Sequence, residues 1–130
     1  LNWISSTFEG EPSDEMMILK KAIERFPTIS EEIMLITHYQ FLQSITNKKL
    51  NYPNKTHTVD GVSMPLKNNK YYNYYKKFIL KKIKEKNVKN IYFFKHENLP
   101  KETITEYINE NCYEVTEDDL FYIYKLNCFN

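Results

Sequence analysis

Apolar residues recur with a helical period in two stretches of this chain. Between Asp14 and Phe26 they fall at about every third or fourth position, and Pro27 follows directly. This spacing predicts an amphipathic helix with Ser13 as its N-cap residue. The same period over residues 70–86 predicts a second helix, with lysines opposite an apolar face. That apolar face consists of Tyr71, Tyr74, Tyr75, Phe78, Ile79 and Ile83.

Two uninterrupted apolar runs, Ile33–Thr37 and Ile91–Phe94, show no alternation with polar residues. Runs of this kind are typical of strands that are covered on both faces. The first run precedes a predicted short helix over 39–47, and the second precedes a predicted helix that opens with Pro100 in its first turn. The chain therefore alternates strands with helices.

The last part of the chain contains two short strand-like runs, "CYEVT" and "FYIYKLN", separated by the polar turn "EDD". So short a connection requires an antiparallel hairpin. Together with the alternation, it predicts an α/β fold: a three-layer Rossmann-like sandwich with a parallel-cored sheet and an antiparallel C-terminal hairpin. The runs Ile33–Thr37 and Ile91–Phe94 are expected to lie side by side and parallel. The 130 residues fit a single domain, 1–130.

Polar side chains follow the two predicted parallel strands directly. His38 comes after the first strand, and His96 and Glu97 come after the second. Open α/β sheets bind ligands outside the carboxyl ends of their strands, so these residues are expected to converge on a small binding site. The long irregular stretch between Leu50 and Asn69 can reach over this site. The complete candidate binding set is His38, Tyr39, Asn54, His57, Asp60, Ser63, His96 and Glu97.

The segment "NYPNKTHTVDGVSMP" carries Gly61, one of only two glycines in the chain. Asp60 and Gly61 form a strong turn dipeptide, because glycine adopts positive φ without steric cost. One interpretation is a structural turn that lets Val59, Val62 and Met64 pack on the core. The other is that the loop lines a cleft through Asn54, His57, Asp60 and Ser63.

Motifs of the common catalytic sites do not occur in the sequence. There is no HxH, HExxH or CxxC arrangement for a metal, no GxSxG nucleophile motif, and no glycine-rich phosphate loop. We therefore expect no catalytic residue, no metal and no cofactor, although a free-standing small enzyme or metabolite-binding domain with its site at the strand ends remains an alternative.

Charge is distributed unevenly along the chain, although the net charge is only +1. Residues 67–89 contain nine lysines and one acid, Glu85. The aromatic residues of this helix are expected on the buried face, where they could not stack on bases, so no nucleic-acid partner is predicted. A solvated helix face is the first interpretation, and attraction to an anionic lipid surface is the second.

The two cysteines, Cys112 and Cys128, flank the predicted hairpin. Hairpin pairing would bring them within bridging distance if the register allows it. A disulfide between them would require an oxidising compartment, whereas two reduced cysteines at the edge of the core are the alternative.

Residues 28–130 resemble the C-terminal region that follows the membrane spans of polytopic glycosyltransferase-like proteins of AT-rich bacteria. The resemblance is carried by "ISEEIMLITHYQFLQ", the loop "NYPNKTHTVDGVSMP", the lysine-rich helix and the cysteine-bracketed end. It implies an extracytoplasmic (periplasmic) domain that aids acceptor recognition or assembly without performing chemistry, with the upstream membrane region of the same chain as its partner. Residues 1–13 would then be a linker or tail from that region. The oligomeric state stays open.

Overall fold

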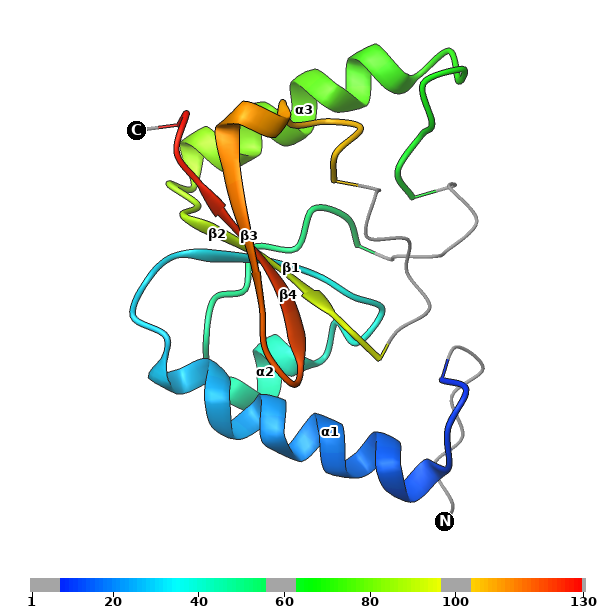
Figure 1. Cartoon of the computed structure of the whole chain (residues 1–130), viewed down its shortest axis with the longest axis vertical. Coiled ribbons are helices and arrows are strands. Elements are labelled where there is room, and N and C mark those ends of the chain that lie inside the picture. Colours follow the sequence, from blue (N-terminus) through cyan, green and yellow to red (C-terminus); the bar gives the residue numbers. More distant parts are fainter. Residues whose placement is uncertain (1–7, 56–62, 97–103, 130) are drawn as a thin grey trace.

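The computed structural model describes residues 8–55, 63–96 and 104–129. Within these residues the fold consists of three α-helices and one four-stranded sheet (Figure 1). The helices are α1 (Pro12–Arg25), α2 (Leu42–Thr46) and α3 (Tyr72–Glu85). The strands are β1 (Ile33–Ile36), β2 (Asn90–Phe94), β3 (Tyr113–Glu117) and β4 (Phe121–Leu126). Two short 3₁₀ turns, Phe26–Thr28 and Glu110–Cys112, follow α1 and precede β3.

The strands lie in the order β1-β2-β4-β3. β1 and β2 are parallel, with Ile33 opposite Asn90 and Ile36 opposite Phe93, which confirms the predicted side-by-side arrangement. The other two pairs, β2 with β4 and β3 with β4, are antiparallel. The chain is therefore α/β with a mixed sheet, in which parallel pairing is restricted to one pair of strands and does not extend through a core.

Helices pack on both faces of the β1–β2 half of the sheet. Because successive side chains of a strand point to opposite faces, Ile33 and Leu35 of β1 join the apolar cluster that contains residues of α1 and α2. Met34 and Ile36 join the other cluster, which contains Ile79 and other residues of α3. In Figure 1, α3 crosses one side of the sheet while α1 and α2 lie on the other. All four β1 residues are completely buried as a result.

Helix α1 begins earlier than the sequence pattern predicts. Its N-cap residue is Glu11 and Pro12 occupies the first turn, so Ser13 lies inside the helix and is not its cap. Proline suits the first turn because its fixed φ matches a helix and its missing N–H would be unpaired there anyway. Asp14 and Glu15 in the same turn complement the positive end of the helix dipole.

Helix α3 buries only part of the predicted face, because Ile79 and Ile83 are buried and Tyr75 is half-buried as part of the same cluster. Tyr72, Ile79 and Ile83 are buried, whereas Tyr71, Tyr74 and Phe78 are exposed. The orientation follows from packing, because Tyr72 stacks on Tyr107 with ring centroids 5.4 Å apart and turns its neighbours outward. The prediction of one aromatic stripe in the core was therefore wrong for the three exposed residues.

Two other predicted helices differ from the structure. The helix over 39–47 is limited to α2, because Asn47 adopts a left-handed conformation with φ of 50° at its C-cap. The helix expected after Pro100 does not continue through the described residues from 104 onward. There the amides of Tyr107 and Ile108 both donate to the carbonyl of Ile104, which makes a single turn. Pro100 itself lies outside the described residues.

The turn between β3 and β4 is fastened to the end of α1. Arg25, in the last turn of α1, forms an ion pair with Asp118. The Asp118 Oδ1 also accepts hydrogen bonds from the amides of Leu120 and Phe121, each 2.8 Å long. Burial alone would raise the pKa of Asp118, but these two hydrogen bonds and Arg25 outweigh it and hold the pKa below its usual value. The turn is therefore stabilised by charge as well as by backbone pairing.

Candidate functional site

A cleft with a volume of about 660 Å³ opens beside α3 and is the best candidate for a ligand site. Its walls come from α2, from residues 49–55 and from the C-terminal half of α3. We call it the lysine cleft, and we call residues 49–55 the edge segment. The lining residues are Gln40, Gln43, Lys49, Asn51, Tyr52, Pro53, Asn54, Lys55, Phe78, Lys82 and Lys86.

The edge segment is fixed along the outer side of β1. The amide of Leu35 donates to the carbonyl of Leu50 over 2.9 Å. Asn51, which adopts a left-handed φ of 46°, donates from its side-chain amide to the carbonyl of Ile33 and to the carboxylate of Glu32. Asparagine tolerates this conformation better than most residues. Backbone and side chain together therefore position the exposed Lys49 and Lys55 in the wall of the cleft.

Hydrogen bonds join the edge segment to α3 and to the residues before α2. The Lys82 ammonium donates to the carbonyl of Tyr52 over 2.6 Å. The Tyr75 hydroxyl donates to the side-chain oxygen of Asn54 over 2.8 Å, and the Gln40 side chain donates to the carbonyl of Asn54. Burial raises the pKa of Tyr75 to about 12, so its hydroxyl stays protonated as a donor. The cleft is thus preformed.

Positive charge dominates the cleft. Four lysines line it, Lys49, Lys55, Lys82 and Lys86, and no carboxylate is among the lining residues. Burial lowers the pKa of Lys82, and the neighbouring charge of Lys86 lowers it further. A bound anion would offset the cost of desolvation and the repulsion, because charge-assisted hydrogen bonds to an anion favour the charged ammonium.

His38 and Tyr39, two of the predicted binding residues, contact each other. Their ring centroids are 3.8 Å apart. Tyr39 is buried and its hydroxyl donates to the equally buried carboxylate of Glu15 over 2.5 Å. Its ring also meets Phe94 edge-on, with centroids 5.8 Å apart. These contacts give Tyr39 a place in the core between α1 and β2, and His38 lies half-buried beside it.

His96 is exposed and lies near the β3–β4 turn, where its Nε2 is 3.1 Å from the carbonyl oxygen of Asp119. The parallel pairing of β1 with β2 does place His38 and His96 beyond the same ends of neighbouring strands. Their described contacts, however, are with different parts of the fold. Glu97 lies outside the described residues, so convergence of the three side chains stays a prediction.

Asn54 and Ser63, from the long loop, are brought together. The Asn54 side-chain amide donates to the carbonyl of Ser63 over 2.8 Å, and Asn54 lines the lysine cleft. Met64 is buried in the core, as the structural interpretation of the loop predicts. His57, Asp60 and Gly61 lie outside the described residues, as do Val59 and Val62.

Sequence reasoning missed the lysines of the cleft. Lys82 and Lys86 are four residues apart, a spacing that puts both on one face of a helix and could have identified half of the site. Lys49 and Lys55 carry no such signal, because only the pairing of the edge segment with β1 brings them opposite α3.

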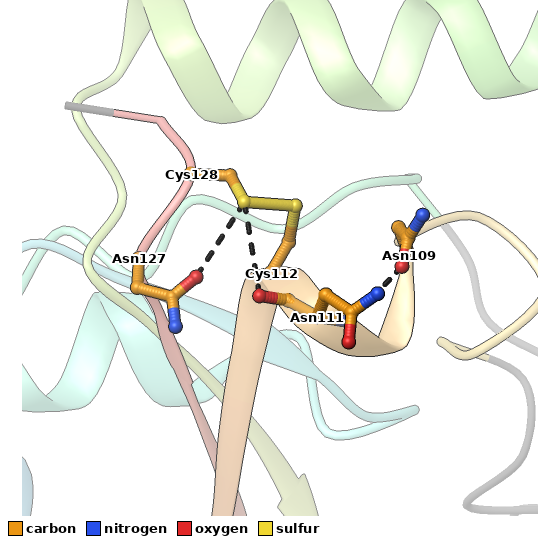
Figure 2. The surroundings of a disulfide bond; sticks show 5 residues. All are labelled: Asn109, Asn111, Cys112, Asn127 and Cys128. Carbon is orange, nitrogen blue, oxygen red and sulfur yellow. Dashed lines mark hydrogen bonds between the residues drawn. A yellow bond between two sulfur atoms is a disulfide. The ribbon is translucent and has the colours of Figure 1, made fainter.

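Cys112 and Cys128 form a disulfide that joins the start of β3 to the residues after β4 (Figure 2). Their Cα atoms are 4.9 Å apart, and 16 positions separate them in the sequence. A backbone hydrogen bond from Asn127 to Cys112 lies next to the bridge. The Asn109 side chain accepts from the amide of Asn111, which orders the 3₁₀ turn that leads into Cys112. The predicted pairing is confirmed.

Among residues 8–55, 63–96 and 104–129, no three His, Cys, Asp or Glu side chains are grouped in a way that could ligate a metal. Within the same ranges, every helix is too short or too polar to cross a lipid bilayer. No family model, curated protein or solved structure matches this chain. The site must therefore be interpreted from its own chemistry.

Proposed function

We propose that this chain is a non-catalytic binding domain that takes a phosphate-bearing ligand in the lysine cleft. The observation that carries the proposal is the convergence of four lysines without a lining carboxylate. The amides of Gln40, Gln43 and Asn51 in the same walls are engaged in hydrogen bonds within the protein, so the lysines are the groups that would meet the anion. A volume of about 660 Å³ suits a ligand of the size of a sugar phosphate or larger.

We further propose that this domain aids acceptor recognition in a membrane protein of the glycosyltransferase-like kind that its sequence resembles. Acceptor recognition in such a protein would require binding of a charged, phosphate-linked group, which a lysine cleft supports. The disulfide supports an extracytoplasmic position, because such bonds persist in oxidising compartments. The helices on both faces of the β1–β2 half support the finer comparison with a Rossmann-like three-layer sandwich.

A test of this wider assignment is the gene sequence upstream of Leu1. Several apolar stretches of about 20 residues each, the length that spans a bilayer, are expected there. Their absence would contradict the membrane assignment and leave the binding proposal for the cleft intact.

The cleft is tested by titrating the chain with pyrophosphate, with heat of binding as the signal. Lys55→Gln and Lys86→Gln are the informative variants, because both lysines line the cleft and are exposed, so that their loss should not affect folding. Each substitution is expected to weaken binding about fivefold to tenfold, since a hydrogen bond between charged groups contributes about 1.5–3 kcal/mol before solvent screening. Lys20→Gln with Lys21→Gln on exposed positions of α1 is the matched control.

The pH dependence of the same titration tests whether the cleft lysines bind the anion. Because the anion stabilises the charged ammonium groups, affinity for pyrophosphate should fall as pH rises through the pKa values that the cleft lysines have without ligand. The pKa of Lys82 is lowered mainly by burial. The loss of affinity should therefore start at a lower pH than it would in a cleft of fully solvated lysines. An absence of pyrophosphate binding, or equal weakening in the α1 control, would refute the proposal.

A second candidate is a small enzyme or metabolite-binding domain with its site at the strand ends. The parallel register of β1 and β2, which places His38 and His96 after neighbouring strands, favours it. Replacing both histidines with alanine tests it, and unchanged ligand binding would remove this site from consideration.

A further inference from the structure

The exposed face of α3 carries a stripe of aromatic side chains. Tyr71 is 57% exposed, Tyr74 is 77% exposed and Phe78 is 41% exposed. Tyr71 is the N-cap residue and the other two lie in the first two turns. Their spacing of three and four residues places all three on one side of the helix. We call these three residues the aromatic stripe.

Lysines border the aromatic stripe on both sides. With 3.6 residues per turn, Lys70, Lys77 and Lys81 fall along one flank, and Lys82 and Lys86 fall along the other. Four of these five side chains are exposed, and Lys82 is half-buried. Glu85 is the single acid between Tyr72 and Lys86, and it pairs with Lys81. The face is therefore aromatic along its centre and basic along its edges.

This arrangement matches the requirements of an anionic lipid surface. Tyrosine and phenylalanine rings are favourable at the level of the lipid headgroups. Flanking lysines can extend their apolar stems along the membrane surface while their ammonium groups reach the phosphates. The charge of the flanks complements anionic headgroups, and a helix that lies flat on the surface does not need to cross the bilayer.

Single-stranded nucleic acid fits the same face less well. Base stacking needs open ring faces, but the Lys70 ammonium lies 4.9 Å from the ring centroid of Tyr71, and the Lys82 ammonium lies 5.7 Å from that of Phe78. The face has no arginine, the residue best suited to bidentate contact with phosphates and bases. The only arginine, Arg25, is paired with Asp118 on another part of the molecule.

We propose that the aromatic stripe and its flanking lysines dock this domain on an anionic lipid bilayer. The stripe borders the lysine cleft, because Phe78 belongs to both and the flanking Lys82 and Lys86 also line the cleft. The inference stands on the exposed face of α3 and does not require the cleft to bind a ligand.

The test is co-sedimentation of the chain with phosphatidylcholine vesicles that contain or lack phosphatidylglycerol. Binding is expected only with the anionic lipid and should weaken as salt is added, since exposed charges are screened. Lys77→Gln with Lys81→Gln should reduce the partition coefficient about fivefold for each lysine. Tyr71→Gln with Tyr74→Gln should reduce it on the order of tenfold, because the rings no longer enter the headgroup region.

Matched controls separate docking from general effects of surface changes. Met17→Gln with Ile45→Gln replaces two exposed apolar residues on α1 and α2, and Lys20→Gln with Lys21→Gln removes two exposed lysines from α1. Both should retain vesicle binding within about twofold. Loss of binding in these controls equal to the loss in the α3 variants would overturn the proposal, as would binding to vesicles without anionic lipid.

Two further measurements separate docking through α3 from lipid binding at the cleft and from nucleic-acid binding. Lys49→Gln with Lys55→Gln alters the cleft alone, so it should weaken pyrophosphate binding and leave vesicle binding nearly unchanged. Vesicle binding that is lost in this variant and kept in the α3 variants would refute docking through α3. The second measurement is titration with single-stranded oligothymidylate. Tighter binding to it than to vesicles, with dependence on Tyr74, would overturn the lipid assignment.

Discussion

The two halves of the sheet differ most at their outer strands, β1 and β3. In the β1–β2 half, every strand residue is buried, and helices cover both faces. In the β3–β4 half, the residues of β3 from Glu114 to Glu117 are all exposed. This half has instead the disulfide at one end and the charged turn of Asp118 at the other.

The difference shows that one sheet can be stabilised by two separate physical effects. Burial of apolar side chains accounts for the first half, at roughly 1.5–3 kcal/mol for each large side chain that is fully buried. In the second half, β4 also buries Phe121, Tyr124 and Leu126, whereas the largely exposed β3 is held by its pairing with β4, by the disulfide and by the charged turn. Substitutions should therefore affect the two halves by different mechanisms and to different extents.

The largest effect is expected from Leu35→Ala in the centre of β1. Leu35 is completely buried, so the substitution removes apolar contacts and leaves a cavity. It should reduce the free energy of unfolding by about 4 kcal/mol, within the range for buried leucines. Urea unfolding followed by circular dichroism measures this, and a loss below about 1 kcal/mol would contradict the description of β1 as core.

The next largest effect on stability is expected from removal of the disulfide in the β3–β4 half. Cys112→Ser combined with Cys128→Ser should lower the free energy of unfolding by about 3 kcal/mol, because the unfolded chain regains the freedom of a closed loop of this size. Urea unfolding of the double variant beside the oxidised parent checks the value. Chemical reduction of the parent should reproduce it, and equal stability before and after reduction would show that the bridge contributes nothing.

A smaller effect is expected from Asp118→Asn in the β3–β4 turn, on the order of 1 kcal/mol at neutral pH, since the ion pair with Arg25 is partly solvated. Because the pKa of Asp118 is lowered on folding, its stabilising contribution is complete above the pKa of the unfolded chain. That contribution is lost as pH falls through the lower, folded value.

Thermal unfolding measured from neutral to acidic pH tests the Asp118 assignment. The parent should lose stability toward acidic pH more steeply than the Asp118→Asn variant. Parallel curves for the two proteins would mean that Asp118 does not titrate with folding.

The smallest effect is expected from Val115→Ala on β3. Val115 is 51% exposed, so truncation removes little buried surface and should change the free energy of unfolding by no more than about 0.5 kcal/mol. It is the counterpart of Leu35→Ala on the other edge strand. A loss comparable with that of Leu35→Ala, measured in the same urea series, would abolish the contrast between the two halves.

The sequence pattern was sufficient to locate the strands, because a buried strand needs no polar alternation and a hairpin needs only a short polar turn. The runs at Ile33 and Ile91 and the hairpin were recognised on these grounds. The sequence pattern was not sufficient for the orientation of α3. Tyrosine is favourable both in a core and on a surface, so only the stacking of Tyr72 on Tyr107 decides which aromatic residues are buried.

The candidate site depended even more on tertiary structure. Its lysines come from two segments more than 25 residues apart, and the pairing of Leu50 with Leu35 that joins them has no local signature. The left-handed conformation of Asn51 could not be predicted from the sequence either, although asparagine permits it. By contrast, placing His38 and His96 after neighbouring strands required only the prediction that β1 and β2 pair in parallel.

The contact of the edge segment with β1 also limits how copies of this chain can associate. A sheet polymerises edge to edge only if both outer strands can accept a new neighbour. Here the outer side of β1 already bonds Leu50 and Asn51, so a second copy could pair with this edge only by displacing the edge segment.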